Sequence, residues 1–186
     1  IVSADVLAGS GFDAEFTITN AGSAIGTQAI SWTVYASLDT VIGGADDRIA
    51  ASGSLAGGLA SGTSATVALS DGTGGVWPSE AGDYYLLVDV YAADDLAPGD
   101  NRNRSAGTTG VYEPVRMSPA AASASTGQSV AFTVTGGTGS YTYAVTTAGS
   151  GSPVFAGGVY TAGASAGTDI LTVSDAAYAG AGWTAS

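Results

Sequence analysis

The sequence contains no cysteine and no histidine, and its four basic residues are all arginines. Without cysteine no disulfide can hold the fold together, and zinc sites built from cysteine or histidine are excluded. Without an imidazole, the Ser-His-Asp and Cys-His catalytic arrangements lack their base. Without lysine, a Ser–Lys dyad and Schiff-base chemistry are excluded too. The core must therefore be held by burial alone.

Paired carboxylates are the catalytic arrangement that this composition leaves open. A glycosidase needs two carboxyl groups facing each other about 5–10 Å apart across a cleft. The acids here fall in turns or singly on exposed strand faces, as Asp89 does, and the rims of β-sandwiches seldom form such a cleft. We therefore predict that the chain is not an enzyme and has no catalytic residues.

Positive charge is also scarce, with 16 acids against four arginines and a net charge of −12. Residues 1–113 carry 14 of the acids and three of the arginines. A field of this sign repels phosphate backbones and anionic membrane surfaces, so nucleic acid is not an expected partner. It is compatible with calcium or with a cationic partner.

Long hydrophobic runs are absent as well, so no segment is expected to span a membrane. The chain starts at Ile1, and its one methionine is Met117. We interpret it as a mature or excised fragment, monomeric as a fragment, whose export signal lies upstream.

What the sequence does have is apolar alternation, most clearly in the run AISWTVYASLD at residues 29–39. Its apolar residues fall on one side of an extended strand, namely Ile30, Trp32, Val34, Ala36 and Leu38. A two-residue period with β-branched and aromatic residues predicts a half-buried strand. Trp32 is the expected main anchor of the first core.

Similar short runs recur along the chain, and no segment of ten or more residues has a helical period. We predict strands at 13–20, 49–55, 64–69, 84–91, 115–118, 129–135, 141–147, 159–160 and 169–174, with a polar turn at 93–103. The acids thin out near Glu113-Pro114. The predicted fold is all-β, with two tandem immunoglobulin-like β-sandwiches at residues 1–113 and 114–186, the second incomplete or closed by a very short last strand.

Several ordered motifs of the first domain carry a resemblance. They are FTITNAGSA (16–24), WTVYASLD (32–39), ADD (45–47), GSLAGGLASGTSATVAL (53–69) and GDYYLLVDVYAADDLAPGDNRNR (82–104). This order is similar to that of the bacterial cell-adhesion-related domain, CARDB. The segment at 100–103 departs from the pattern, because the family tends to have a glutamate and paired asparagines there.

The second domain has shorter motifs, GGTGSYTYAV (136–145), GVYTAG (158–163) and AGTDILTVSDA (166–176). These resemble bacterial immunoglobulin-like surface repeats. Together the resemblances imply exported sandwiches of about seven strands that serve adhesion or display within larger proteins. They imply no enzyme activity and no fixed ligand.

Aspartates in two loops are candidate ligands for calcium, which takes six to eight oxygen ligands. The first set is Asp39, Asp46 and Asp47, without the spacing of an EF-hand. The second set is Asp94 and Asp95 with Asp100 and Asn101. The alternative is that these side chains hydrogen-bond local backbone amides in solvated turns.

Aromatic residues are the other candidates. Trp77, in a glycine-rich loop at 71–78, could contact a ligand such as a sugar ring, although burial over the end of its own sandwich is the interpretation we favour. Trp183 is expected to be an edge or capping residue. Tyr35, Tyr85 and Tyr91 are expected on the outer face of one sheet, as cross-strand pairs or as a flat ligand platform.

The sequence therefore predicts a non-catalytic extracellular module of a bacterial surface protein, for adhesion, display or spacing, with an unknown protein or glycan as its partner. The alternative is an accessory module of a larger secreted enzyme that binds polysaccharide. A third hypothesis is a spacer stiffened by calcium between its domains.

Overall fold

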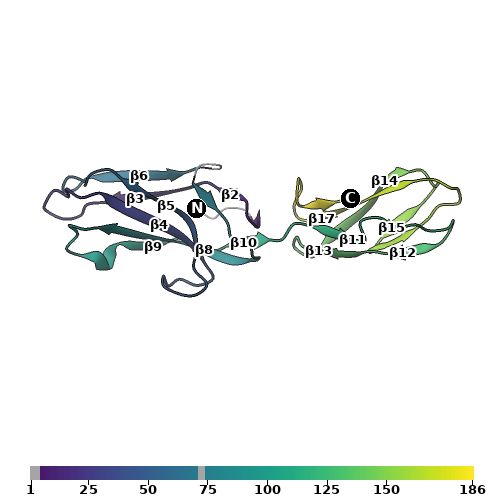
Figure 1. The fold of residues 1–186 in the computed structure, drawn as a ribbon, viewed down its shortest axis with the longest axis horizontal. Helices are drawn as coiled ribbons and strands as arrows, with labels where there is room; N and C mark the ends of the chain where they lie inside the picture. The colour runs from purple at the N-terminus through teal and green to yellow at the C-terminus, as the bar shows by residue number, and fades with distance from the viewer. Residues whose placement is uncertain (1–4, 71–73) are drawn as a thin grey trace. The chain divides into compact units, whose positions relative to one another are not determined.

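The computed structural model describes residues 5–70 and 74–186, and within these ranges the chain is built from β-strands joined by turns, with no α-helix (Figure 1). The predicted all-β class is confirmed. The chain divides into two compact units, unit 1 ending at Val111 and unit 2 running from Tyr112 to Ser186. No helical segment in the described ranges has the length and apolar character that crossing a membrane requires.

Unit 1 is a sandwich whose larger sheet contains most of its strands. The order is β1 (Val6–Leu7), β10 (Thr109–Tyr112), β8 (Gly82–Ala92), β4 (Ile30–Ser37) and β5 (Arg48–Leu55), and β9 (Arg102–Arg104) also pairs with β8. The smaller layer has β3 (Ala14–Thr19) paired with β6 (Ser64–Leu69), and β2 (Gly11–Phe12) paired with β7 (Gly75–Val76). The pairs β10–β8, β2–β7, β3–β6, β4–β5, β4–β8 and β8–β9 are antiparallel.

The core of unit 1 lies between these layers and follows the predicted alternation. On β4, Ile30, Val34 and Ala36 are buried and Trp32 is half-buried. The prediction was wrong for Leu38, which is 53% exposed, because the strand ends at Ser37 and the chain turns away there. Ser37 is fully buried instead, and its hydroxyl donates to the Asp46 carboxylate.

The main aromatic anchor is also not the predicted one. The Trp32 ring packs against Gly53 and meets Phe16 edge to face, with ring centroids 5.5 Å apart. Trp77 is buried far more deeply, at 2% exposure, and packs 5.0 Å from the Phe12 ring. The loop position of Trp77 in the sequence gave no periodic signal of this burial.

The segment predicted as a polar turn at 93–103 contains regular structure that the sequence did not indicate. A 3-10 helix, η1 (Pro98–Asp100), leads into β9, whose register sets Val88 opposite Asn103. None of these three residues, two arginines and an asparagine, is among the β-branched and aromatic residues that favour strands. Backbone pairing with the long strand β8 places them in the sheet despite that preference.

Unit 2 is built from eight short strands in three small sheets. They are β11 (Arg116–Ser118) with β13 (Thr133–Thr135); β12 (Ser129–Ala131), β16 (Val159–Thr161) and β15 (Val154–Ala156); and β14 (Tyr141–Ala148), β17 (Asp169–Asp175) and β18 (Thr184–Ala185). The run predicted as one strand at 129–135 breaks at Phe132. The core gathers around Val115, Phe155 and Val173.

Candidate functional site

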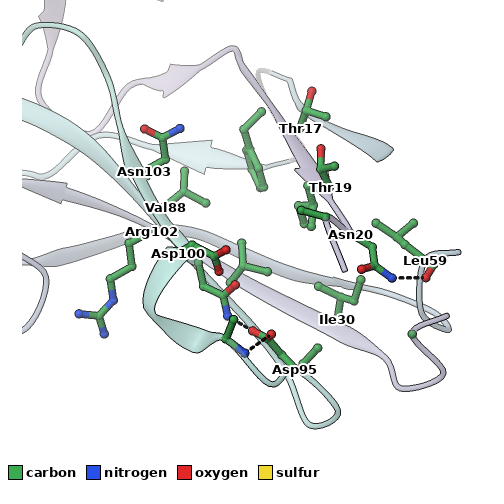
Figure 2. Close-up of a pocket in the computed structure, with 18 of the residues that line it drawn as sticks. Thr17, Thr19, Asn20, Ile30, Leu59, Val88, Asp95, Asp100, Arg102 and Asn103 are labelled. Atoms are coloured by element: carbon green, nitrogen blue, oxygen red, sulfur yellow. Dashed lines mark hydrogen bonds between the residues drawn. The ribbon is translucent and has the colours of Figure 1, made fainter. Parts of the chain in front are cut away.

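Unit 1 has a groove along one flank of the sandwich, between β3 of the smaller layer and β9 of the larger sheet (Figure 2). It encloses about 840 Å³. We call it the flank groove. Within the described residues, β3 pairs only with β6 and β9 only with β8, so no strand closes the sandwich between them.

The floor of the flank groove is the inner face of the larger sheet. Alternate residues of β8 face inward, and Leu86, Val88 and Val90 are only partly buried although they pack against the core. Ile30 and Val34 of β4 complete the floor. The smaller layer has two strands here and cannot cover this face, which leaves apolar surface open beside β3.

The rim of the groove carries exposed apolar residues as well as charge. Leu96 is 99% exposed and Ile25 is 67% exposed, and both line the groove. Four acids line it, Glu15, Asp94, Asp95 and Asp100, against the two arginines of β9. Arg102 points away from the groove in Figure 2 and pairs with Asp89 at 2.9 Å.

Asp94, which lines the groove, forms a bridge between two loops. A carboxylate oxygen of Asp94 accepts hydrogen bonds from the Thr27 amide (2.6 Å), the Thr27 hydroxyl (3.2 Å) and the Gln28 amide (3.1 Å). The hydrogen bond from the Thr27 amide is the largest of the causes that lower the pKa of Asp94. Asp94 therefore fastens the loop after β3 to the loop after β8.

Asn20 also fixes the loop after β3. Its side-chain amide donates to the carbonyl oxygens of Ala24 and Leu59, each at 2.9 Å, and its side-chain oxygen accepts from the Gly22 amide. The second bond reaches across 39 residues, and Figure 2 shows it at the groove end. The N-x-G turn after β3 thus ties two loops together, which the sequence pattern indicated only as a turn.

The second predicted acidic loop has its carboxylates on this rim. Asp95 accepts from the Ala97 amide at 2.9 Å and from the Asn101 side chain at 2.7 Å (Figure 2). These bonds order the turn that leads into η1. Asp100 belongs to η1 itself and lines the groove.

The first predicted calcium set lies elsewhere, in the loop between β4 and β5. Asp39 accepts from the Val41 amide, Asp46 from the Leu38 amide and the Ser37 hydroxyl, and Asp47 from the amides of Gly43 and Gly44. In the described part of the chain, no group of three acidic side chains is placed to hold a metal ion. Calcium binding at Asp39, Asp46 and Asp47 stays a prediction.

The electrostatics of Asp47 follow from these bonds. Desolvation raises its pKa, but the hydrogen bonds, led by the Gly43 amide, outweigh it, and the pKa lies below its ordinary value of 3.8. The carboxylate is therefore charged at neutral pH and holds the Gly43-Gly44 turn.

The aromatic candidates are not brought together. The Trp77 ring has almost no surface for a ligand to touch, since it is 2% exposed. Tyr35, Tyr85 and Tyr91 do share the outer face of β4 and β8, but Tyr35 is opposite Leu87, Tyr85 opposite Ser37 and Tyr91 opposite Ser31. They form neither direct cross-strand tyrosine pairs nor a continuous platform.

Two polar networks in unit 2 were missed at the level of sequence. Asp175 is 4% exposed and accepts from the Thr138 amide (2.6 Å), the Thr138 hydroxyl (2.9 Å) and the Ala177 amide (2.8 Å). Asp169 accepts from the Ser150 amide and hydroxyl and from the Tyr160 hydroxyl. Apart from Ala177, two residues after Asp175, the partners are 9 to 37 residues distant, so no local motif marks them.

No family model matches the chain, and no curated protein matches it. A solved structure of a C-terminal 282-residue fragment of intimin, in complex with the intimin-binding domain of the translocated intimin receptor, is similar at 13% identity and a TM-score of 0.42. The match covers 88% of this chain and 54% of that one, so the chain spans about half the length of the fragment.

Proposed function

We propose that the chain is a non-catalytic adhesion or display module at the outer surface of a bacterial cell, where it contacts another molecule. The observation that carries this proposal is the flank groove, whose floor is apolar and whose lining loops are joined by the Asp94 bridge. An apolar groove with bonded carboxylates in its lining is suited to holding a partner. The CARDB resemblance and the cysteine-free, lysine-free composition support the same assignment.

A binding screen tests this proposal. The chain 1–186, immobilised on beads, is exposed to arrays of extracellular-matrix proteins and of glycans. We expect saturable binding of at least one protein on the array. Binding to glycans alone would instead favour the accessory, polysaccharide-binding module of a secreted enzyme, and binding to neither array would refute an adhesive role.

A further inference from the structure

The free edge of β3 is the feature that says how a partner would bind. The Asn20 amide donates to Thr63 and the Asn20 carbonyl accepts from Gly62, so Asn20 faces β6 with both backbone groups. Backbone direction alternates along an antiparallel strand. Ile18 and Phe16 therefore also face β6, and the N–H and C=O groups of Glu15, Thr17 and Thr19 point toward the flank groove.

β3 has few of the devices that natural sheets use to protect an edge, and its one charged residue is Glu15, near its start. It is six residues long, contains neither proline nor lysine, and places Thr17 and Thr19, which favour strands, along the groove. Its six residues offer about 20 Å of backbone to a neighbour. No strand among the described residues occupies that side.

The opposite edge, on β9, is protected. β9 has three residues, two of them arginines, and the Asn103 side chain already accepts the Arg104 amide at 2.8 Å. Because charged, short edges resist pairing, a strand entering the groove has β3 as its available partner.

The floor and the rim define what such a strand must carry. A strand paired with β3 turns every second side chain inward, onto the half-buried Leu86, Val88 and Val90. Its inward positions must be apolar. The exposed side chains of Ile25 and Leu96 flank the path and extend the apolar contact.

Charge sets where on an antiparallel partner strand a basic residue belongs. Asp94, Asp95 and Asp100 gather where β3 ends, since Asp94 bridges to the loop that follows β3. An antiparallel neighbour begins beside the end of β3. Its amino end therefore meets the carboxylates, and a basic residue there is complementary to them.

We propose that the flank groove binds an extended segment of a partner protein by β-strand addition to β3, antiparallel, with apolar side chains at alternate positions and a basic residue at its amino end. Backbone hydrogen bonds supply affinity in this mode, and the alternate side chains supply specificity. The inference rests on the proposed adhesive function, because it names the partner's chemistry and the way it is held.

Two proline variants test the hydrogen bonding. Thr17→Pro removes an N–H that points into the groove, while the opposite residue in the register, Thr66, points its N–H away from β3 on the far edge of the same two strands. Both threonines are exposed, so Thr66→Pro is a matched control. Their melting temperatures report the cost of each proline to the fold.

The probe is the peptide Arg-Thr-Val-Thr-Val-Thr-Val, with a fluorophore at its carboxyl end, and binding is followed by fluorescence polarisation with the chain 1–186. We expect Thr17→Pro to weaken binding by about tenfold or more, because the β3 edge loses a hydrogen-bond donor and its strand geometry. Thr66→Pro should change binding by less than about twofold, because Thr66 faces the far edge of β6, away from the groove. Moving the arginine to the carboxyl end of the peptide is expected to weaken binding.

A second variant keeps the test sharp if Thr17→Pro does not fold. Asp100→Lys reverses a rim charge without touching the strands, and we expect it to weaken binding and to reduce its dependence on salt. No binding of the probe to the native chain, equal loss in the two proline variants, or equal binding of the two peptides overturns strand addition. If the Thr17→Pro variant still binds its partner on the protein array, strand addition fails and the adhesive function stands; if the native chain binds the probe but nothing on either array, the adhesive function fails.

Discussion

Removing the Asp175 carboxylate should selectively destabilise unit 2. Asp175 accepts three hydrogen bonds of 2.6–2.9 Å from Thr138 and Ala177 and is 4% exposed. Gly137 packs against the same carboxylate, where an added Cβ would lie 2.4 Å from an oxygen. In Asp175→Ala, two backbone amides lose a charged acceptor, and we expect a loss of about 2–3 kcal/mol in the free energy of unfolding, allowing for partial rescue by water.

The three tryptophans provide the assay, because each indole N–H gives its own signal in a proton–nitrogen correlation spectrum. Trp183 is 7% exposed and its carbonyl accepts the Asp175 amide at 2.8 Å, so its signal reports unit 2, while Trp32 and Trp77 report unit 1. With a urea dependence of about 1 kcal/mol per molar for a domain of this size, the midpoint of the Trp183 transition should fall by about 2 M or more. The midpoint should fall less in Asp175→Asn, because asparagine keeps the shape of the side chain and one acceptor oxygen.

The pH dependence follows from the direction of the pKa shift. Desolvation raises the pKa of Asp175, but the hydrogen bonds outweigh it, so the folded value is below 3.8. The stability that the Asp175 carboxylate contributes is therefore complete above pH 3.8 and is lost as the pH falls through the folded pKa. The native chain and Asp175→Ala should converge in stability in that acid range. An unchanged Trp183 midpoint at pH 7, or a shift of the Trp77 signal instead, would contradict this reasoning.

Three further outcomes are expected. Gly53→Ala places a Cβ 2.4 Å from the Trp32 ring and should therefore destabilise unit 1 by about 1–3 kcal/mol. The Trp32 indole signal measures this loss, and the control Ser52→Ala, at an exposed neighbouring position, should leave the stability of unit 1 unchanged. Ser150→Ala should raise the pKa of Asp169, since the Ser150 hydroxyl is the largest cause of its lowering; a carbon-detected carboxyl titration measures it, and an unmoved midpoint would rule this cause out. Titration with about 1 mM calcium, the range of weak extracellular sites, should leave the amide signals of Gly43 and Gly44 in place, because Asp47 already accepts both amides; saturable shifts there would establish the predicted site.

The strands of the two units could be predicted wherever burial alternates. Ile18, Val34 and Val67 are buried with the period that their runs indicate. β9 could not, because its RNR sequence carries no apolar period and pairs only through the backbone of β8. The flank groove could not either, because it arises from a strand edge that is left without a neighbour, and that is a property of sheet order.

Leu38 and Trp77 show where a local pattern is not enough to predict how deeply a side chain is buried. Leu38 continues the period of β4 but lies one residue past its end, where the turn at Asp39 redirects the chain. The favoured burial of Trp77 is confirmed, but its depth could not be predicted, because Trp77 follows a glycine-rich stretch with no period and packs on Phe12, 65 residues earlier. Local pattern predicts which runs are strands, whereas long-range packing decides where a strand stops and which aromatic ring is central.

The bridge from Asp94 to Thr27 and Gln28 lies beside the flank groove, at the loop that follows β3. In the proposed strand addition, the amino end of the bound segment would meet these bonded loops, so the position of its first residue would be defined before any side chain is read. The groove would then select for a minimum length of the bound segment. A segment too short to extend along the whole groove would leave part of the apolar floor uncovered, whereas a longer one would extend out of the opposite end.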